Sequence, residues 1–332
     1  MRLEDALEVT AVLADQLEEQ AAADAFSLDG QRHLERPAIP HVGVGVSMGR
    51  SPLDVRIAVR GWTSEDIRHF ELSSLDKLPL SQAELDIVVT GEIYATPPTS
   101  LAANATRFTA RCQPVHPGVS IGHVNVLAGT LAALVDVDVN GLLETHMLSN
   151  NHILANSISA SNPNAARRGD GILQPGSFDG GTPPAVGQLW KWVTLQARGN
   201  TADAALAACD ASVGWDPTVL GIGAVSGTVV PTHGAQVQKV GRTTGHTLGT
   251  ISAFPVRSLP VKFGSAVYRF DEVLEVSGQG AAFSAPGDSG ALILDMSRAA
   301  VGLLFAGSRT VTYGNPISRV KTELGFSRIQ GA

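Results

Sequence analysis

The sequence predicts a mainly β fold that follows a small α+β region at the N-terminus. From about residue 119 to the end, short apolar runs are cut by Gly and Pro, which is typical of many short strands joined by turns. Aromatic residues make up only 5% of the chain, whereas Gly (35) and Pro (18) are plentiful, and this balance favours short strands over long helices. Before residue 119, the pattern instead indicates one amphipathic helix and one strand–helix–strand unit.

The first element is a helix from residue 3 to about residue 25, within an N-terminal helical segment that we place at 1–40. Acidic residues separate leucines that recur at near-helical spacing, namely Leu3, Leu7, Leu13 and Leu17. Helical periodicity usually reports burial, so we expect this helix to pack on its own domain. The alternative is that it binds a partner or a second copy of the chain, forming a homo-oligomer.

Residues 41–95 are expected to form a small β-α-β module. Two strands are predicted at "HVGVGVSM" and "LDVRIAVRGW", and a third at "ELDIVVTGEIY". Between them, "TSEDIRHFELSSL" opens with a Thr or Ser cap and an early acid, as helices do. Residues 96–118 are rich in Pro, Ala and Thr, so we predict a linker, or a strap over the domain that follows.

Residues 119–332 are predicted to form one domain, an all-β sandwich or barrel. Its candidate strands are short and near-regularly spaced, and they include "GTLAALVDV", "THMLSN", "QVQKVG", "LGTISAF", "DEVLEV", "ALILD" and "VGLLFAG". The final stretch "NPISRVKTELGF" is expected to form a closing helix.

Composition excludes several classes of function. The formal net charge of −7 argues against a nucleic-acid binder, because such proteins usually carry a basic field. No run approaches the roughly 18 apolar residues of a membrane span, and acids interrupt the N-terminal stretch where a secretory signal would be apolar. Cys112 and Cys209 have no metal-ligand spacing, and we expect neither a metal nor a cofactor. We therefore expect a cytoplasmic protein with two reduced thiols that are buried or half-buried.

The stretch "FSAPGDSGALIL" at 283–294 raises the question of chemistry. Pro, Gly, Asp and Ser before an apolar run are common in an ordinary turn that leads into a strand. The alternative is that Ser289 is a nucleophile, which would require a base and an acid elsewhere in the chain.

The chain has nine histidines, and context selects His152 as the candidate base. In "THMLSNNHILANS", His152 follows a predicted strand at a Ser-Asn-Asn turn. The competing histidines have weaker settings: His123, His233 and His246. Among the acids, Asp203 in "NTADAALAACD" opens a small-residue apolar stretch that could bury its carboxylate. Its competitors are Asp210, Asp170 and Asp179.

The order His152, Asp203, Ser289 is the one found in chymotrypsin, and it differs from the orders of subtilisin and the α/β-hydrolases. The α/β-hydrolase motif also fails locally, because position 291 is Ala where that motif needs Gly. With "LSNNHIL", "ADAAL" and "PGDSGALIL" in this order, the segment 119–325 resembles a chymotrypsin-like (trypsin-fold) serine protease of a bacterial cytoplasmic type with an extra N-terminal region. The resemblance implies two packed six-stranded β-barrels, with the site between them.

The resemblance also implies roles for these residues. Ser289 would attack a peptide carbonyl, His152 would accept the hydroxyl proton and Asp203 would orient the imidazole. The backbone N–H groups of Gly287 and Ser289 would form the oxyanion hole. Asp288, which precedes the nucleophile, is expected to be satisfied within the fold.

By the same resemblance, Phe283 and Ser284 would form the base of the primary substrate pocket, and Phe305, Ala306 and Gly307 one wall. No acid is expected at the pocket base, so we predict a small or apolar residue before the cut rather than Lys or Arg. The predicted function is that of a serine endopeptidase acting on a peptide or protein, including a single partner protein. The alternatives are an esterase with the same triad and a catalytically silent scaffold; residues 1–115 could act as a brake or a docking module.

Overall fold

The computed structural model describes residues 1–27, 41–49, 54–75, 78, 80–81, 84–96 and 106–332. Parts of the predicted N-terminal segment (28–40) and of the predicted linker (97–105) lie outside the described residues.

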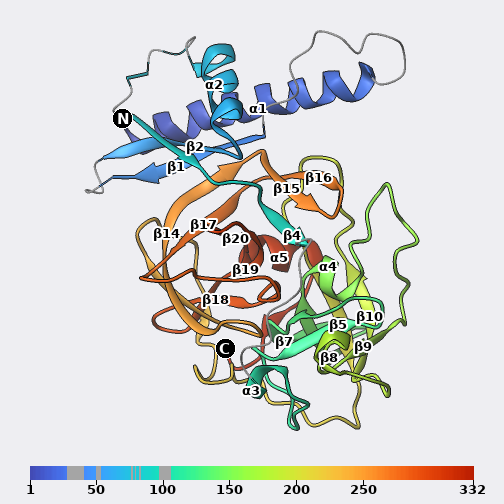
Figure 1. Cartoon of the computed structure of the whole chain (residues 1–332). Coiled ribbons are helices and arrows are strands. Elements are labelled where there is room, and N and C mark those ends of the chain that lie inside the picture. The colour runs from blue at the N-terminus through green and yellow to red at the C-terminus, as the bar shows by residue number, and fades with distance from the viewer. Residues whose placement is uncertain (28–40, 50–53, 76–77, 79, 82–83, 97–105) are drawn as a thin grey trace.

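Six antiparallel strands close into a barrel in the C-terminal part of the chain (Figure 1). Each strand pairs with the next and the last returns to the first, in the order β13 (Gln236–Gly241), β14 (Gly245–Arg257), β17 (Val273–Gly278), β20 (Thr312–Pro316), β19 (Ala299–Gly307) and β18 (Leu292–Asp295). Apolar side chains such as Ile251, Leu274 and Ile293 fill the interior, since alternate residues of a barrel strand point inward. A hairpin of β15 (Leu259–Phe263) and β16 (Ala266–Phe270) extends this sheet, and β12 (Gly227–Thr228) pairs with β19.

The second sheet curls into a half-barrel beside the closed one. Its strands lie in the order β21 (Arg328–Ile329), β7 (Ala133–Val139), β8 (Leu142–Ser149), β11 (Ala205–Cys209), β10 (Gly187–Trp192), β9 (Gly171–Leu173), β5 (Ser120–His123) and β6 (Gly129–Thr130). The helical pieces are short: α3 (Thr106–Thr109), α4 (Asn151–Leu154), η3 (Ser177–Asp179) and the predicted closing helix α5 (Ile317–Leu324). The predicted mainly β architecture of chymotrypsin type is confirmed, with one sheet closed and the other curled.

The N-terminal region joins the closed barrel edge to edge. It contains α1 (Leu3–Ser27), β1 (Val42–Met48), β2 (Val55–Gly61), α2 (Ser64–Ser73) and β3 (Leu85–Val89). Leu13 and Leu17 of α1 are fully buried in one cluster with β1 and β2, so the helix packs on its own chain as predicted. Because β1 pairs antiparallel with β14, this region continues the barrel sheet. The division of the chain into separately folding domains stays a prediction.

A single short strand, β4 (Tyr94–Thr96), leaves the N-terminal region and enters the barrel domain. It lies between β15, with which it is parallel, and β19, with which it is antiparallel (Figure 1). Residues 94–96, where the predicted module (41–95) meets the predicted linker (96–118), are therefore a strand of the same sheet as β15 and β19.

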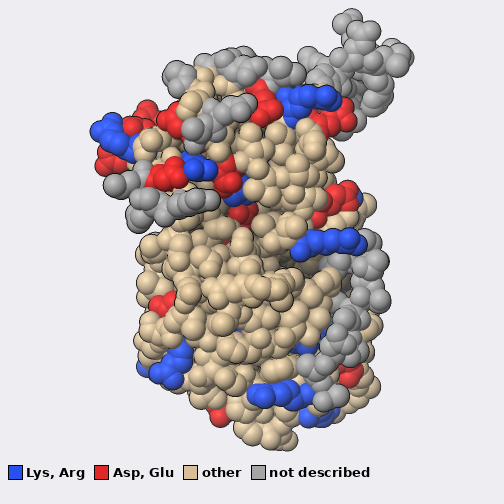
Figure 2. All heavy atoms as spheres, turned by 60° about the vertical axis from the view of Figure 1, so that its left-hand side comes forward, with Lys and Arg blue, Asp and Glu red and all other residues tan. Residues whose placement is uncertain are grey.

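Charge is unevenly distributed over the surface. On the face drawn in Figure 2, Asp, Glu, Lys and Arg side chains crowd the N-terminal region at the top. Below it, the broad centre of the face is uncharged and further charged side chains lie along its sides and lower edge. None of the described helices combines the length and the apolar character needed to cross a bilayer.

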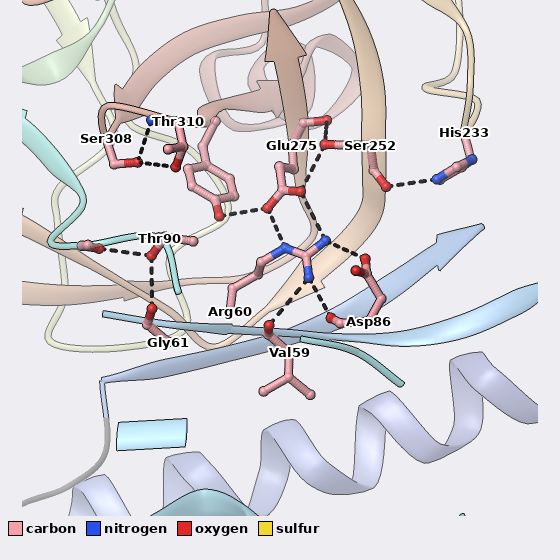
Figure 3. Close-up of polar contacts among 12 residues, drawn as sticks. Val59, Arg60, Gly61, Asp86, Thr90, His233, Ser252, Glu275, Ser308 and Thr310 are labelled. Carbon is pink, nitrogen blue, oxygen red and sulfur yellow. Dashed lines mark hydrogen bonds and ion pairs between the residues drawn. The ribbon is translucent and has the colours of Figure 1, made fainter. Parts of the chain in front are cut away.

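A buried ion-pair network fastens β2 to the closed barrel (Figure 3). The guanidinium of Arg60 donates to both carboxylate oxygens of Glu275 in β17, at 2.7 and 3.1 Å, and both side chains are 2% exposed. Arg60 also donates to Asp86 of β3 at 2.8 Å, and the Tyr313 hydroxyl of β20 donates to Glu275 at 2.8 Å. The network thus joins two strands of the N-terminal region to two strands of the barrel.

We expect Arg60→Ala to lower the free energy of unfolding by about 3–5 kcal/mol, because removing one partner leaves the Glu275 carboxylate buried and uncompensated. Urea titration followed by circular dichroism measures this change. Arg56→Ala is the matched control on the same strand. Its ion pair with Asp54 is more than a third exposed, so we expect a change of only about 0–1 kcal/mol. Equal losses in the two variants would contradict the importance of the buried network.

Candidate active site

His152 is held by the two asparagines before it. Strand β8 ends at Ser149, and α4 places the imidazole in the first turn after it. The Asn150 side chain donates to the Asp203 carbonyl at 2.8 Å, and the Asn151 side chain donates to the Ile158 carbonyl at 2.9 Å. Both asparagines are fully buried. The hydrogen bonds of these two buried amides therefore fix the turn that carries His152.

Asp203 lies fully buried beside His152 in the loop before β11. Its Oδ2 is in hydrogen-bond contact with His152 Nδ1, and its Oδ1 accepts from the His152 backbone N–H at 3.2 Å. The Asp203 N–H donates to the Asn315 side chain at 3.0 Å, which fixes the loop against β20. A carboxylate on Nδ1 leaves Nε2 as the nitrogen able to accept a proton.

The loop that carries Ser289 is built around the buried Asp288. One carboxylate oxygen of Asp288 accepts from the backbone N–H groups of Thr243 and Thr244, at 2.8 and 3.1 Å. The other accepts from the Thr244 hydroxyl at 2.6 Å and lies 3.3 Å from Lys239 Nζ, which is also fully buried. Burial lowers the pKa of Lys239, and the attraction of Asp288 opposes that shift. The expectation that Asp288 is satisfied within the fold is confirmed.

Thr130 joins the Ser289 loop to the His152 turn. Its N–H donates to the Ser289 carbonyl at 2.8 Å, and its own carbonyl accepts from the Ser149 hydroxyl at 2.7 Å. Gly290, at φ 93°, passes so close that an added Cβ would lie 2.2 Å from both the Ser149 hydroxyl and the Thr130 carbonyl. Only glycine fits here, and the contact brings residues far apart in the sequence into one site.

The backbone before Ser289 depends on Gly287. Gly287 has φ 97°, and a Cβ there would lie 2.5 Å from the Thr243 hydroxyl, so this position also requires glycine. Its carbonyl is turned away to accept from the Thr130 hydroxyl at 3.0 Å. Within the described residues, neither the Gly287 N–H nor the Ser289 N–H donates a hydrogen bond, so both are available to a ligand.

The structure brings His152 and Asp203 into direct contact. Ser289 is connected to this pair only indirectly, through the hydrogen bonds that Thr130 makes with the Ser289 carbonyl and the Ser149 hydroxyl. No hydrogen bond joins the Ser289 hydroxyl to His152, and within the described part of the chain the buried Nε2 of His152 has no partner. The imidazole meets the edge of the Phe263 ring, with centroids 5.8 Å apart. A buried ring nitrogen without a partner is costly, so this atom is open to one.

Ser289 opens into a cavity of about 700 Å³. Three residues predicted for substrate binding line it: Ser284, Ala306 and Gly307. The other two, Phe283 and Phe305, are 2% and 0% exposed, are not among its lining residues, and pack in the cores behind it. The remaining barrel-side lining residues are Ala282, Ala285, Pro286, Leu304, Ser308 and Arg309.

Sequence reasoning missed one wall of this cavity. Thr90, Gly91, Glu92, Tyr94 and Ala95 line it from the N-terminal region. Their sequence, "TGEIYA", resembles any strand end, and its role follows from long-range pairing with β15 and β19 that no local pattern records.

The competing histidines and acids are engaged elsewhere, and none of them lines the cavity. Their contacts are His123 with Asp170 at 3.0 Å, His233 with the Ser252 carbonyl at 2.7 Å, His246 with Gln238 at 3.0 Å, Asp179 with Arg242, and Asp210 with Ser212 at 2.6 Å.

Comparisons with known proteins find similarity at the level of structure. No family model matches the chain, and no curated protein matches it. Among solved structures, the chain is similar to Thermobifida fusca protease A, with 17% identity, a TM-score of 0.47, and coverage of 65% of this chain and 100% of that one. For Cellulomonas bogoriensis chymotrypsin, the identity is 18% and the TM-score is 0.45, with coverage of 66% of this chain and 99% of that one. A glutamic acid-specific serine protease gives 19%, 0.45, 64% and 100% for the same four measures.

We expect both cysteines to react slowly with alkylating reagents in the folded protein. Both are free and half-buried, and burial raises the pKa of Cys112 and raises that of Cys209 to about 12. The thiolate is the reactive form, so little of it is present at pH 8. Mass spectrometry after iodoacetamide treatment should show slow labelling that becomes fast in urea. Fast labelling of the native protein with loss of activity would instead point to a cysteine nucleophile.

Proposed function

We propose that this protein is a serine endopeptidase that uses Ser289 as nucleophile, His152 as general base and Asp203 as the group that orients the base. The observation that carries the proposal is the buried contact between His152 and Asp203, which leaves His152 Nε2 without a partner among the described residues. Ser289, on its glycine-dependent loop, lines the cavity. The proposal requires the Ser289 hydroxyl to bond to His152 Nε2 when substrate is bound, since catalytic hydrogen bonds often form fully only in the substrate complex.

In the proposed reaction, the Ser289 oxygen attacks the peptide carbonyl while its proton passes to His152 Nε2. The carbonyl oxygen becomes negative and is met by the backbone N–H groups of Gly287 and Ser289. Collapse of this intermediate breaks the C–N bond, and His152 gives its proton to the leaving amine. Water then repeats the sequence on the acyl-enzyme, which releases the acid and restores Ser289. Asp203 stabilises the imidazolium without taking the proton.

The same chemistry would serve an esterase, and the same fold without chemistry would serve as a scaffold. The cavity favours the peptidase, because a hollow of about 700 Å³ beside Ser289 can hold a side chain of a peptide substrate. Processing of a single partner protein and self-association through the N-terminal region stay predictions.

Ser289→Ala should abolish peptide hydrolysis and labelling by a fluorophosphonate probe, with no loss of folding. Asp203→Asn should lower kcat by about 10⁴, the cost of a wrong imidazole tautomer in such a triad. Asp210→Asn is the matched control, because the carboxylate of this exposed acid accepts from the Ser212 hydroxyl and Asp210 does not line the cavity, so its rate should equal that of wild type. Labelling of Ser289→Ala, or failure of the folded wild type to be labelled, would refute the proposal.

A peptide library should show cleavage after small or apolar residues. Alanine, leucine and proline side chains form much of the cavity lining, namely Ala282, Ala285, Pro286, Leu304 and Ala306. The one acid in the lining, Glu92, is neutralised by Lys262 Nζ at 2.7 Å. A dominant preference for Arg or Lys would overturn this specificity.

A further inference from the structure

The backbone edge of β19 beside Ser289 is already occupied by the chain's own strand β4. On this side, Leu304 exchanges hydrogen bonds with Gly290 and Ala291, at 2.8 and 3.0 Å. Three residues further along, Gly307 pairs with Tyr94. The opposite edge of β19 is filled by β20, which pairs Gly307 with Thr312. No edge of β19 at Gly307 is left for a second strand within the described structure.

The direction of β4 carries the chain toward the candidate active site. Because β4 is antiparallel to β19, it runs from its pairing with Gly307 back toward Leu304, the residue of β19 that is bonded to the Ser289 loop. At its last residue, Thr96, β4 is in register with Phe263 of β15, and the Phe263 ring packs against the His152 imidazole. Tyr94 and Ala95 share the cavity wall with Ser289.

Several weak contacts and two buried side chains hold β4 in place. Ile93 and Ala95 are 0% and 3% exposed and pack in the cluster around Phe263 and Phe305. The Lys262 ammonium donates to Glu92 at 2.7 Å and lies over the Tyr94 ring. Upstream, the Thr90 N–H donates to the Gly61 carbonyl at 2.8 Å, and the Thr90 hydroxyl donates to the same carbonyl at 3.2 Å (Figure 3). These bonds tie the segment before β4 to β2, the strand that carries Arg60.

We propose that β4 is an intramolecular occupant of the peptide-binding edge, so that the structure is a self-inhibited form and a peptide enters only when β4 leaves. This inference rests on the proposed function of the Ser289 site. An extended peptide substrate gains affinity by adding a strand to an exposed sheet edge, and β4 makes that addition with the chain's own backbone. A peptide then binds only to the minor state in which β4 is released. The apparent affinity for the peptide equals the intrinsic affinity multiplied by the fraction of molecules in that state.

A substitution that expels β4 should activate the enzyme. A charged residue cannot be buried at position 95 without a large cost, so Ala95→Glu favours the released strand. We expect peptide hydrolysis to rise by about tenfold or more, because release of β4 increases the population of the binding-competent state. Val89→Glu supplies the same charge as a matched control, because Val89 lies on the preceding strand β3 and is 48% exposed. Circular dichroism and a thermal melt check that Ala95→Glu stays folded.

A reversible lock tests the opposite direction in one protein. Tyr94 and Lys262 are register partners across β4 and β15, a separation that a disulfide can bridge. Tyr94→Cys/Lys262→Cys should lose peptide hydrolysis on oxidation and regain it with dithiothreitol, while Tyr94→Cys alone and wild type are unaffected by the same treatment. Equal activity of the oxidised and reduced double variant would overturn the proposal, whatever the outcome for Ala95→Glu.

Binding separates this inference from the proposed function. In a Ser289→Ala background, fluorescein-labelled casein should bind more tightly when Ala95→Glu is added and more weakly when the lock is oxidised, as measured by fluorescence anisotropy. If no variant cleaves peptides but binding changes in this way, the occupancy of the edge stands and the peptidase assignment fails. If peptides are cleaved at the same rate in every variant and binding does not change, the occupancy fails and the peptidase assignment stands.

Discussion

The hydrogen bonds of Thr130 are the constraint on which the candidate site depends. One residue at the end of β6 binds the Ser289 carbonyl with its N–H, the Gly287 carbonyl with its hydroxyl and the Ser149 hydroxyl with its carbonyl. The Arg242 N–H also donates to the Thr130 hydroxyl, at 3.0 Å. The half-barrel and the closed barrel are thereby bonded between the loop that carries Ser289 and the strand that ends before His152, and the two glycines of the serine loop let the backbones approach closely enough.

Much of this arrangement could be predicted from local patterns. The Gly- and Pro-cut apolar runs predicted the strands, and alternation in "VRIAVRG" predicted β2. The pairing of His152 with Asp203 was inferred from the order of three motifs, and the structure brings these two together. Substrate-pocket residues were harder, because a strand pattern does not show which face a side chain takes. Ser284 and Gly307 line the cavity, whereas Phe283 and Phe305 pack behind it.

What local patterns could not give was the relation of the N-terminal region to the barrel. The strand at 94–96 has no feature that distinguishes it from the end of any module, and its partners lie more than 160 positions later in the chain. The pairing of β1 with β14 and the contact of Arg60 with Glu275 are similarly long-range. Such contacts depend on the shape and charge complementarity of strands that have already formed. Local sequence patterns therefore predict each strand but not which strands pair with one another.

The buried position of Arg60 affects how the role of the N-terminal region can be studied. Deleting that region would remove the cation that pairs with Glu275 and would expose the edge of β14. The Glu275 carboxylate would then lie unpaired beside Tyr313, which is the register partner of Ala306 in the cavity wall. An inactive fragment of this kind would report a damaged barrel rather than a missing activator. Point changes within β4 leave those anchors intact, so they are the cleaner way to test the role of the N-terminal region in a protein whose two parts share one sheet.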